Sequence, residues 1–331
     1  MSAFMRSNRT STMLKLLLFR GLIALCLCLW LSSPLAAAEQ MRFPNRAVKV
    51  MVPAGAGGSL GQESRAIAPY LEKQLGVPIV LEYVTGAEGM IAYNKFYREK
   101  PDGYSLLCFN LTSALSLELT REQAKYKLKD LALVAGQNIK THVLVVHPEK
   151  WKTFEEFLKE AKQRNVSLAA TGGSADLQGR LLESSTGIKF NWVPYASAAE
   201  GMAAVAGKHV EALLTFAITP RPMIQAGRLR GLAVFSPKPE PTLPDVPTYK
   251  ALGHEEIPPL MVYGIFAAPP GTPAPVVKVL EKAVKNACAD REFNKMAEKI
   301  GLVVDYRSTA ELIKLTAQNY ELLTKYRQFL K

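Results

Sequence analysis

Hydrophobic and polar residues change their spacing along the chain, and these changes predict where strands and helices lie. Residues 48–52 are almost continuously apolar and β-branched and end at Pro53, so they predict a buried strand. From Ala66 to Leu75 the apolar residues recur at helical spacing, and Gly76 follows them, which predicts a helix that ends at this glycine. The segment 48–76 therefore predicts a strand, a loop and a helix in succession.

The same succession recurs later in the chain. Further strands are predicted at residues 78–81, 105–109, 143–146, 166–170, 210–216 and 229–235. Further helices are predicted through Ile91 and Phe96, from Thr153 to about Gln163, after Asp176, after Tyr195, after Thr272 and from about Thr309 to Leu330. Strands that alternate with helices in this way are typical of an α/β protein. Residues 236–247 contain five prolines, and we expect a surface excursion there.

Two loops of small residues follow predicted strands and precede predicted helices. The first glycine loop, residues 53–62, ends in a Ser-x-x-Gln sequence that has the spacing of a capping box. The second glycine loop, residues 171–176, reads Thr-Gly-Gly-Ser-Ala-Asp. We expect Ser59 and Ser174 to cap the helices that follow. Unpaired N–H groups and the positive end of a helix dipole meet at such loops, so each loop predicts a binding site for an anion.

The first glycine loop has two other interpretations. Residues 56–61 fit a degenerate dinucleotide-binding fingerprint, and Glu82 lies where an acid would bind the ribose. The loop is otherwise a tight turn that simply needs glycine. Because residues 53–62 contain no Lys or Arg, an anion held there would be bound mainly by backbone N–H groups.

Residues 1–38 have the pattern of a cleaved export signal. Four cations precede the apolar run 21–31, and residues 36–38 provide the small side chains of a cleavage site. The apolar run is shorter than the ~20 residues that a membrane span needs. We therefore predict a periplasmic protein that begins at Glu39, and this location argues against a dinucleotide as the ligand.

Composition narrows the class of protein further. The 331 residues are 48% hydrophobic, which is enough to fill two lobes with separate cores. The formal charge of +12 favours anionic partners, but the densest basic run, residues 125–129, is interpreted as a solvated loop, so no nucleic-acid partner is predicted. Cys108 and Cys288 are interpreted as buried free thiols, with a disulfide between them as the alternative.

The sequence contains no recognisable catalytic or metal-binding pattern. The four histidines do not have the spacing of metal ligands, and no general base is identifiable for Ser59 or Ser174. We therefore predict binding without catalysis, with no cofactor and no metal.

Short blocks in a shared order carry a resemblance to a known family. They are Phe43-Pro44-Asn45-Arg46, Val52 to Gly58, Lys100 to Tyr104, Val193-Pro194-Tyr195, Ala226 to Val234, Leu243 to Thr248 and Ala267 to Pro273. In these blocks the chain resembles the periplasmic solute-binding proteins of tripartite tricarboxylate transporters, also called Bug proteins. The resemblance implies an α/β, two-lobed Venus-flytrap fold, similar to type II periplasmic binding proteins, with two chain crossovers. It also implies that residues 39–141 and 263–331 form lobe 1 and residues 142–262 form lobe 2.

The resemblance further implies a function and a set of binding residues. Such proteins bind a small organic carboxylate and deliver it to the integral-membrane permease subunits of the transporter. Carried over by position, the ligand-binding residues of the two loops are Gly57, Gly58, Ser59, Leu60, Thr171, Gly172, Gly173 and Ser174. To these we add residues near the ends of predicted strands, namely Asn110, Thr112, Asp176, Tyr195 and Phe216.

Three positions depart from the pattern of this family. Gly61 stands where the family usually has Asp, Asp176 where it often has His, and Ala54 where an aromatic residue is common. We expect a wider first loop and a negative charge near the second loop. These features favour a monocarboxylate, or an aromatic or amino-bearing acid, over a highly charged acid. Two alternative functions remain, namely an exported enzyme that acts on a carboxylic acid and a ligand-binding subunit for a sensor.

Overall fold

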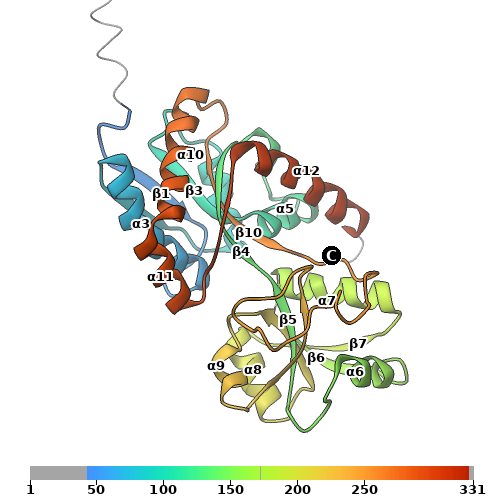
Figure 1. Ribbon diagram of the computed structural model, residues 1–331. Helices are drawn as coiled ribbons and strands as arrows, with labels where there is room; N and C mark the ends of the chain where they lie inside the picture. Colours follow the sequence, from blue (N-terminus) through green and yellow to red (C-terminus); the bar gives the residue numbers. More distant parts are fainter. Residues whose placement is uncertain (1–42, 172, 328–331) are drawn as a thin grey trace, which may run out of the picture. The chain divides into compact units, whose positions relative to one another are not determined.

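In the computed structural model, which describes residues 43–171 and 173–327, the strands form two sheets (Figure 1). The first sheet has the order β11-β4-β10-β3-β1-β2, with bounds Val303–Arg307, Ala132–Lys140, Val262–Ala268, Ser105–Asn110, Val48–Val52 and Ile79–Tyr83. The second sheet has the order β7-β6-β8-β5-β9, with bounds Phe190–Pro194, Val166–Ala170, Ala212–Phe216, His142–Val146 and Arg230–Phe235. The α/β architecture predicted from the sequence is thus present.

Helices accompany both sheets. With the first sheet are α3 (Ser59–Leu75), α4 (Met90–Phe96), α5 (Leu111–Thr120), α10 (Ala274–Ala289), α11 (Arg291–Ile300) and α12 (Thr309–Lys325), together with short 3₁₀ turns η1 (Ala87–Gly89) and η2 (Leu128–Asp130). With the second sheet are α6 (Phe154–Ala161), α7 (Gly173–Thr186), α8 (Ala198–Ala206) and α9 (Arg221–Gln225). None of the helices in residues 43–171 and 173–327 is long and apolar enough to cross a membrane.

The chain passes between the two sheets twice. Thr141 alone separates β4 of the first sheet from β5 of the second, and residues 236–261 lead from β9 back to β10. These are the two crossovers of the predicted fold. The described residues from Arg46 onward belong to one compact unit, and the proposed lobe limits at 141/142 and 262/263 stay a prediction.

The strand registers bring the ends of several strands to one edge of each sheet. In the first sheet β1 is parallel to β2 and β3, and β4 runs in the same direction. Residues 53–58 follow β1, and Asn110 and Lys140 are the last residues of β3 and β4. All of them therefore lie on one side of the sheet, here called the first edge. In the second sheet β6 is parallel to β7 and β8, and His142 of antiparallel β5 lies opposite Phe216. The corresponding side is called the second edge. Thr141 joins the two edges directly.

Hydrophobic clusters on the first sheet and on both faces of the second sheet fix these elements. The core of the first sheet includes Phe109 and Leu115, and it also includes Leu177 and Leu181 from α7, so α7 of the second sheet packs against the first. The core on one face of the second sheet is rich in aromatic residues, including Phe154 and Phe235. Burial of such side chains contributes about 1.5–3 kcal/mol each.

Three predictions about the fold were wrong or incomplete. Strands β4, β7, β10 and β11 were not predicted, and in β4 the residues Gly136, Gln137 and Asn138 interrupt the apolar pattern. Residues 236–247 are not simply a surface excursion, since Glu240 and Leu243 are buried. The hydroxyl of Thr141 donates to Glu240 Oε2 over 2.5 Å, which anchors this segment to the first crossover. Finally, α12 ends at Lys325 within the described residues.

The two cysteines of the described chain are free and buried, as the preferred prediction had it. Burial raises the pKa of each thiol, to about 12 for both Cys108 and Cys288. The thiolate is the reactive form, so neither cysteine has the character of a reactive group.

Candidate functional site

The first glycine loop leads into α3 without a side-chain cap. The N-cap residue is Gly58, and Gln62 N donates to Gly58 O over 2.9 Å, so Ser59 already lies inside the first turn. The predicted capping role of Ser59 is therefore wrong. Ser59 is exposed, and Gln62 instead donates its side-chain N–H to Gly57 O over 3.1 Å.

The carbonyl groups of this loop are tied to other parts of the loop and to α3. Gly55 O accepts from Gly58 N, and Ala56 O accepts from Arg65 Nη1 over 2.6 Å. By contrast, the N–H groups of residues 59–61 find no acceptor among residues 43–171 and 173–327. Helix starts leave such donors open, and the helix dipole adds positive potential there. The first glycine loop thus presents open donors and no competing carboxylate.

Gly61 fixes the shape of this loop. A Cβ atom at Gly61 would lie 2.4 Å from Gly55 O and 2.8 Å from Ala56 O, so the loop backbone packs directly onto the helix. The expectation that Gly61 and Ala54 leave a wider first loop than in other members of the family stays a prediction. The small residue allows a closer approach of the loop to α3.

A buried ion pair lies at the same edge. Lys140 Nζ is 2.8 Å from Glu63 Oε1 of α3 and 2.8 Å from Asn110 Oδ1 at the end of β3, and both charged side chains are buried. Asn138 donates to Glu63 Oε2 over 3.2 Å. Lys140 Nζ also lies 5.5 Å from the ring centroid of Phe216 in the second sheet. The pair therefore connects the start of α3, the start of α5 and the second edge.

Thr112, a predicted ligand-binding residue, has a structural contact. It is completely buried, and its hydroxyl donates to Met261 O over 2.9 Å. This bond ties α5 to the second crossover.

The second glycine loop differs from the first in its contacts. Gly172 lies outside the described residues, and α7 is described from Gly173. Ser174 lies inside the helix rather than at its cap, so its predicted capping role is also wrong. Its Oγ is 3.1 Å from His142 Nε2, and His142 Nδ1 is 3.1 Å from Leu260 O.

The protonation of His142 follows from these partners. A carbonyl oxygen can only accept, so Nδ1 carries the proton and Nε2 accepts from Ser174. Burial lowers the pKa of His142 to about 4, so the ring is neutral near pH 7. Contrary to the prediction, Ser174 does have a neighbouring base, His142. Sequence reasoning missed this base because it lies 32 residues earlier in the chain. Both side chains are buried, however, and His142 also stacks on Phe216 at 5.0 Å.

Asp176 faces the start of its own helix. Its Oδ1 accepts from Thr171 N over 3.0 Å, which places a carboxylate at the second glycine loop as the sequence suggested. Tyr195 follows β7 and is half-buried, and its N–H donates to Ala170 O over 2.8 Å. The second edge thus brings together Thr171, Asp176, Tyr195 and Phe216.

Sequence reasoning missed several residues at these edges, namely Glu63, Lys140, His142 and Gln178. Gln178 bridges the second crossover, since it accepts from Leu260 N over 2.7 Å and donates to Pro258 O over 3.2 Å. Lys140, Thr141 and His142 form a polar run just before the apolar residues 143–146. This run was the available signal for a crossover with polar contacts.

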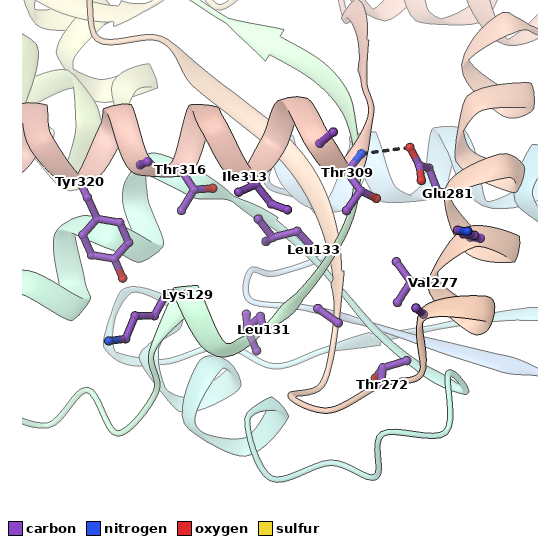
Figure 2. Close-up of a pocket in the computed structure, with 15 residues that line it drawn as sticks. Lys129, Leu131, Leu133, Thr272, Val277, Glu281, Thr309, Ile313, Thr316 and Tyr320 are labelled. Atoms are coloured by element: carbon purple, nitrogen blue, oxygen red, sulfur yellow. Dashed lines mark hydrogen bonds between the residues drawn. The ribbon is translucent and has the colours of Figure 1, made fainter.

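An apolar groove of about 1090 Å³ lies elsewhere on the first sheet (Figure 2). It is lined by faces of α10 and α12 and by Leu131 and Leu133 near the start of β4, with Ile313 and Tyr320 pointing into it. Lys140 is at the other end of β4, about 23–30 Å from Leu133 and Leu131 at the usual rise of a strand. The groove contains none of the predicted ligand-binding residues and is not the candidate site.

Comparison with known proteins decides the family. A family model described as "Tripartite tricarboxylate transporter family receptor" matches residues 64–326. The chain belongs to this family. A curated relative from Agrobacterium vitis, a UPF0065 protein, is 29% identical over 276 residues, which cover 82% of this chain and 79% of the relative.

Solved structures of the family agree. A TctC solute-binding protein from Polaromonas aligns with a TM-score of 0.73 at 27% identity, covering 85% of this chain and 97% of that one. The periplasmic binding protein BugD aligns with a TM-score of 0.71 at 26% identity, covering 86% and 98%. The resemblance inferred from the sequence and the predicted fold class are therefore confirmed, and the chain is a member of a family of periplasmic solute-binding receptors. The predicted signal peptide lies outside the described residues, and the set of binding residues stays a prediction.

Proposed function

We propose that this receptor binds a small organic carboxylate in the periplasm and delivers it to the integral-membrane permease subunits of a tripartite tricarboxylate-type transporter. The observation that carries the proposal is the set of open N–H donors at residues 59–61, on the carboxyl edge of the first sheet. Open α/β sheets bind their ligands at such edges. The same fold is described with malate and with adipate in two Rhodopseudomonas palustris proteins, at 23% and 22% identity, so the fold is compatible with small acids.

The first edge supplies the contacts for a carboxylate. The ligand accepts hydrogen bonds from the backbone at Ser59, Leu60 and Gly61, and each bond to a charged group contributes about 1.5–3 kcal/mol. The neighbouring Leu60 side chain is buried. The second edge, with Thr171, Gly173, Tyr195 and Phe216, contacts the rest of the ligand, and Thr141 lies between the two sets.

The exported-enzyme alternative has one observation in its favour, the contact between Ser174 and His142. Burial of both groups opposes it, because a substrate would have to displace packed side chains to reach the hydroxyl. A sensor partner in place of a permease uses the same ligand site.

Mass spectrometry of the protein purified from its native periplasm tests the proposal. We expect one small acid to co-purify, to raise the melting temperature when added back to stripped protein, and to be recovered unchanged. Conversion of the acid would show an enzyme, and failure of every tested acid to stabilise the protein would overturn carboxylate binding. The intact mass in the same sample tests the predicted start at Glu39.

A further inference from the structure

The apolar groove lies beside β4, between helices that cover opposite faces of the first sheet. Cys108 and Phe109 are successive residues of β3, so their side chains point to opposite faces. On the Cys108 face, Ser64 of α3 donates to Cys108 Sγ over 3.3 Å, and α10 packs on α3. On the Phe109 face, Leu312 of α12 belongs to the same hydrophobic cluster as Phe109. A groove lined by both α10 and α12 therefore runs along the side of the sheet (Figure 1, Figure 2).

On this side of the sheet, a neighbouring strand covers only part of β4. In the sheet order β4 lies between β11 and β10, and β11 pairs with β4 only from Gly136 to Ile139. Residues 132–135 lie beside β10 on one side and have no partner on the other side in any strand that the structure describes. This second side of residues 132–135 is here called the open side of β4. A strand without a neighbour leaves backbone N–H and C=O groups that can pair with another extended chain.

The open side of β4 has none of the features that usually prevent such pairing. Residues 131–135 are Leu-Ala-Leu-Val-Ala, without a charge or a proline. The walls of the groove are apolar, with Val277 on α10 and Ile313 and Ala317 on α12. Ile313 points into the groove and is 59% exposed. Exposed apolar side chains next to an open strand are typical of a site where a protein partner binds.

The open side also discriminates between possible occupants of the groove. An extended peptide can form backbone hydrogen bonds to β4 and place alternate side chains toward α10 and α12. A helix satisfies its backbone groups internally, and a small apolar molecule has no such groups, so neither would pair with β4. An extended chain is therefore the occupant that fits the groove.

Charges at the rim indicate a further property of this occupant. Lys129 and Lys278 line the groove, are exposed and form no ion pair with a residue that the structure describes. Glu281 is the only acid among the described residues of the lining, and its Oε1 already accepts from Thr309 N over 3.0 Å and from Tyr306 Oη over 3.2 Å. The rim therefore favours an acidic residue in the occupant.

We propose, on the basis of the function proposed above, that the apolar groove docks an extended periplasmic segment of the permease. The segment adds as a strand to the open side of β4, next to the point where β11 ends. Its apolar side chains lie between α10 and α12, and an acidic residue lies near Lys129 or Lys278. Because the groove is at the end of β4 opposite Lys140, the segment can bind while a ligand occupies the candidate site.

Uptake and ligand binding measured on the same variants test this inference. Ile313→Asp and Ala317→Glu each place a charge on the apolar wall at an exposed position. We expect each to lower uptake of the co-purified acid at least tenfold in cells with the intact transporter. The Kd of the stripped mature protein for this acid, from isothermal titration, should stay within twofold of the wild-type value. Val80→Asp is the matched control and should change neither quantity, since Val80 is 52% exposed on β2, the outermost strand on the opposite side of the sheet.

Photo-crosslinking in intact cells identifies the occupant. With p-benzoylphenylalanine at position 317, we expect attachment to a periplasmic segment of the permease, and with the same residue at position 80 we expect none. Attachment from position 317 to a second copy of the receptor or to a lipid instead would overturn the inference.

The outcomes separate this inference from the function on which it rests. If uptake requires the receptor but Ile313→Asp and Ala317→Glu support it normally, delivery to the permease holds and the groove is not the docking site. A loss of ligand affinity as large as the loss of uptake also overturns the inference, because the substitutions then act on ligand binding. If deletion of the receptor leaves uptake of the bound acid unchanged, the proposed delivery fails and the inference fails with it.

Discussion

At the scale of single residues, His142 connects the second glycine loop to the second crossover, and this contact predicts a pH dependence. Burial lowers the pKa of His142 to about 4, whereas an unfolded histidine titrates near 6.5. The unfolded state therefore binds the proton first as the pH falls. Stability should decrease between about pH 6.5 and pH 4 by up to roughly 3 kcal/mol, and this contribution should level off below pH 4.

Urea unfolding at several pH values, with wild type and His142→Gln compared, isolates this contribution from that of the carboxylates. The difference in unfolding free energy between the two proteins should shrink as the pH falls from 6.5 to 4. A difference that stays constant over this range would show that His142 does not titrate as its burial indicates.

The two loop serines form a matched pair for a second prediction. Ser174→Ala leaves the buried Nε2 of His142 without its donor, and we expect a loss of about 1–3 kcal/mol. Ser59 is exposed and caps nothing, so Ser59→Ala should change stability by less than ~0.5 kcal/mol. Chemical denaturation measures both. Equal losses for the two variants would restore the capping roles that the structure does not show.

The spacing of residues predicted the two loops but not the contacts of their side chains. Ser59 and Ser174 occupy the same place in two similar motifs, yet only Ser174 meets a histidine, which comes from another strand. Lys140 and Glu63 are separated by 77 positions, and their pairing depends on the neighbouring packing of β4, β10, β3 and α3. Such pairs arise from tertiary structure, so no local pattern reveals them.

At the scale of elements, the close packing of the first loop on α3 predicts different effects for two of its glycines. Gly61→Ala would place a methyl group 2.4 Å from Gly55 O, so the loop must move away from the helix. At Gly57 an added Cβ meets no atom within 4 Å. We expect Gly61→Ala to lower the melting temperature and to weaken binding of the co-purified acid at least tenfold, because the open N–H donors shift with the loop.

Gly57→Ala serves as the control for stability. Its free energy of unfolding should differ from that of the wild type by less than ~0.5 kcal/mol, as for ordinary surface substitutions. If Gly61→Ala melts and binds like the wild type, the contact between the loop and the helix does not define the site.

Element prediction succeeded for several segments with continuous or amphipathic apolar patterns, although it missed the fully buried strand β10. The strands β1 and β3 and the helix α3 carry continuous or amphipathic apolar patterns, and the structure contains them at or close to the predicted bounds. The interior strand β4 was not predicted because it contains polar residues that are buried against polar partners. Gln137 donates to Cys108 Sγ over 3.2 Å, and Asn138 donates to Glu63. From the sequence alone, a strand with buried polar residues has the same pattern as a loop.

At the scale of the whole molecule, the two crossovers and α7 connect the sheets in different ways. Residues 258–261 form hydrogen bonds with His142, Gln178 and Thr112, and Thr141 donates to Glu240, and these bonds hold the crossovers together. Leu177 and Leu181 add apolar packing of α7 against the core of the first sheet. This side of the molecule is therefore firmly joined, and any motion of one lobe against the other must pivot about it.

That pivot leads to a last prediction, closure around the ligand. Contacts to both edges exist together only when the edges approach each other, so a ligand that touches both stabilises the closed state. Small-angle scattering of the mature protein should show a smaller radius of gyration at saturation with the co-purified acid than in the stripped protein. Gly61→Ala, at the same concentration of acid, should keep the larger radius because its first edge no longer holds the carboxylate. An unchanged radius in the saturated wild-type protein would mean that the two edges are already in their binding positions without ligand.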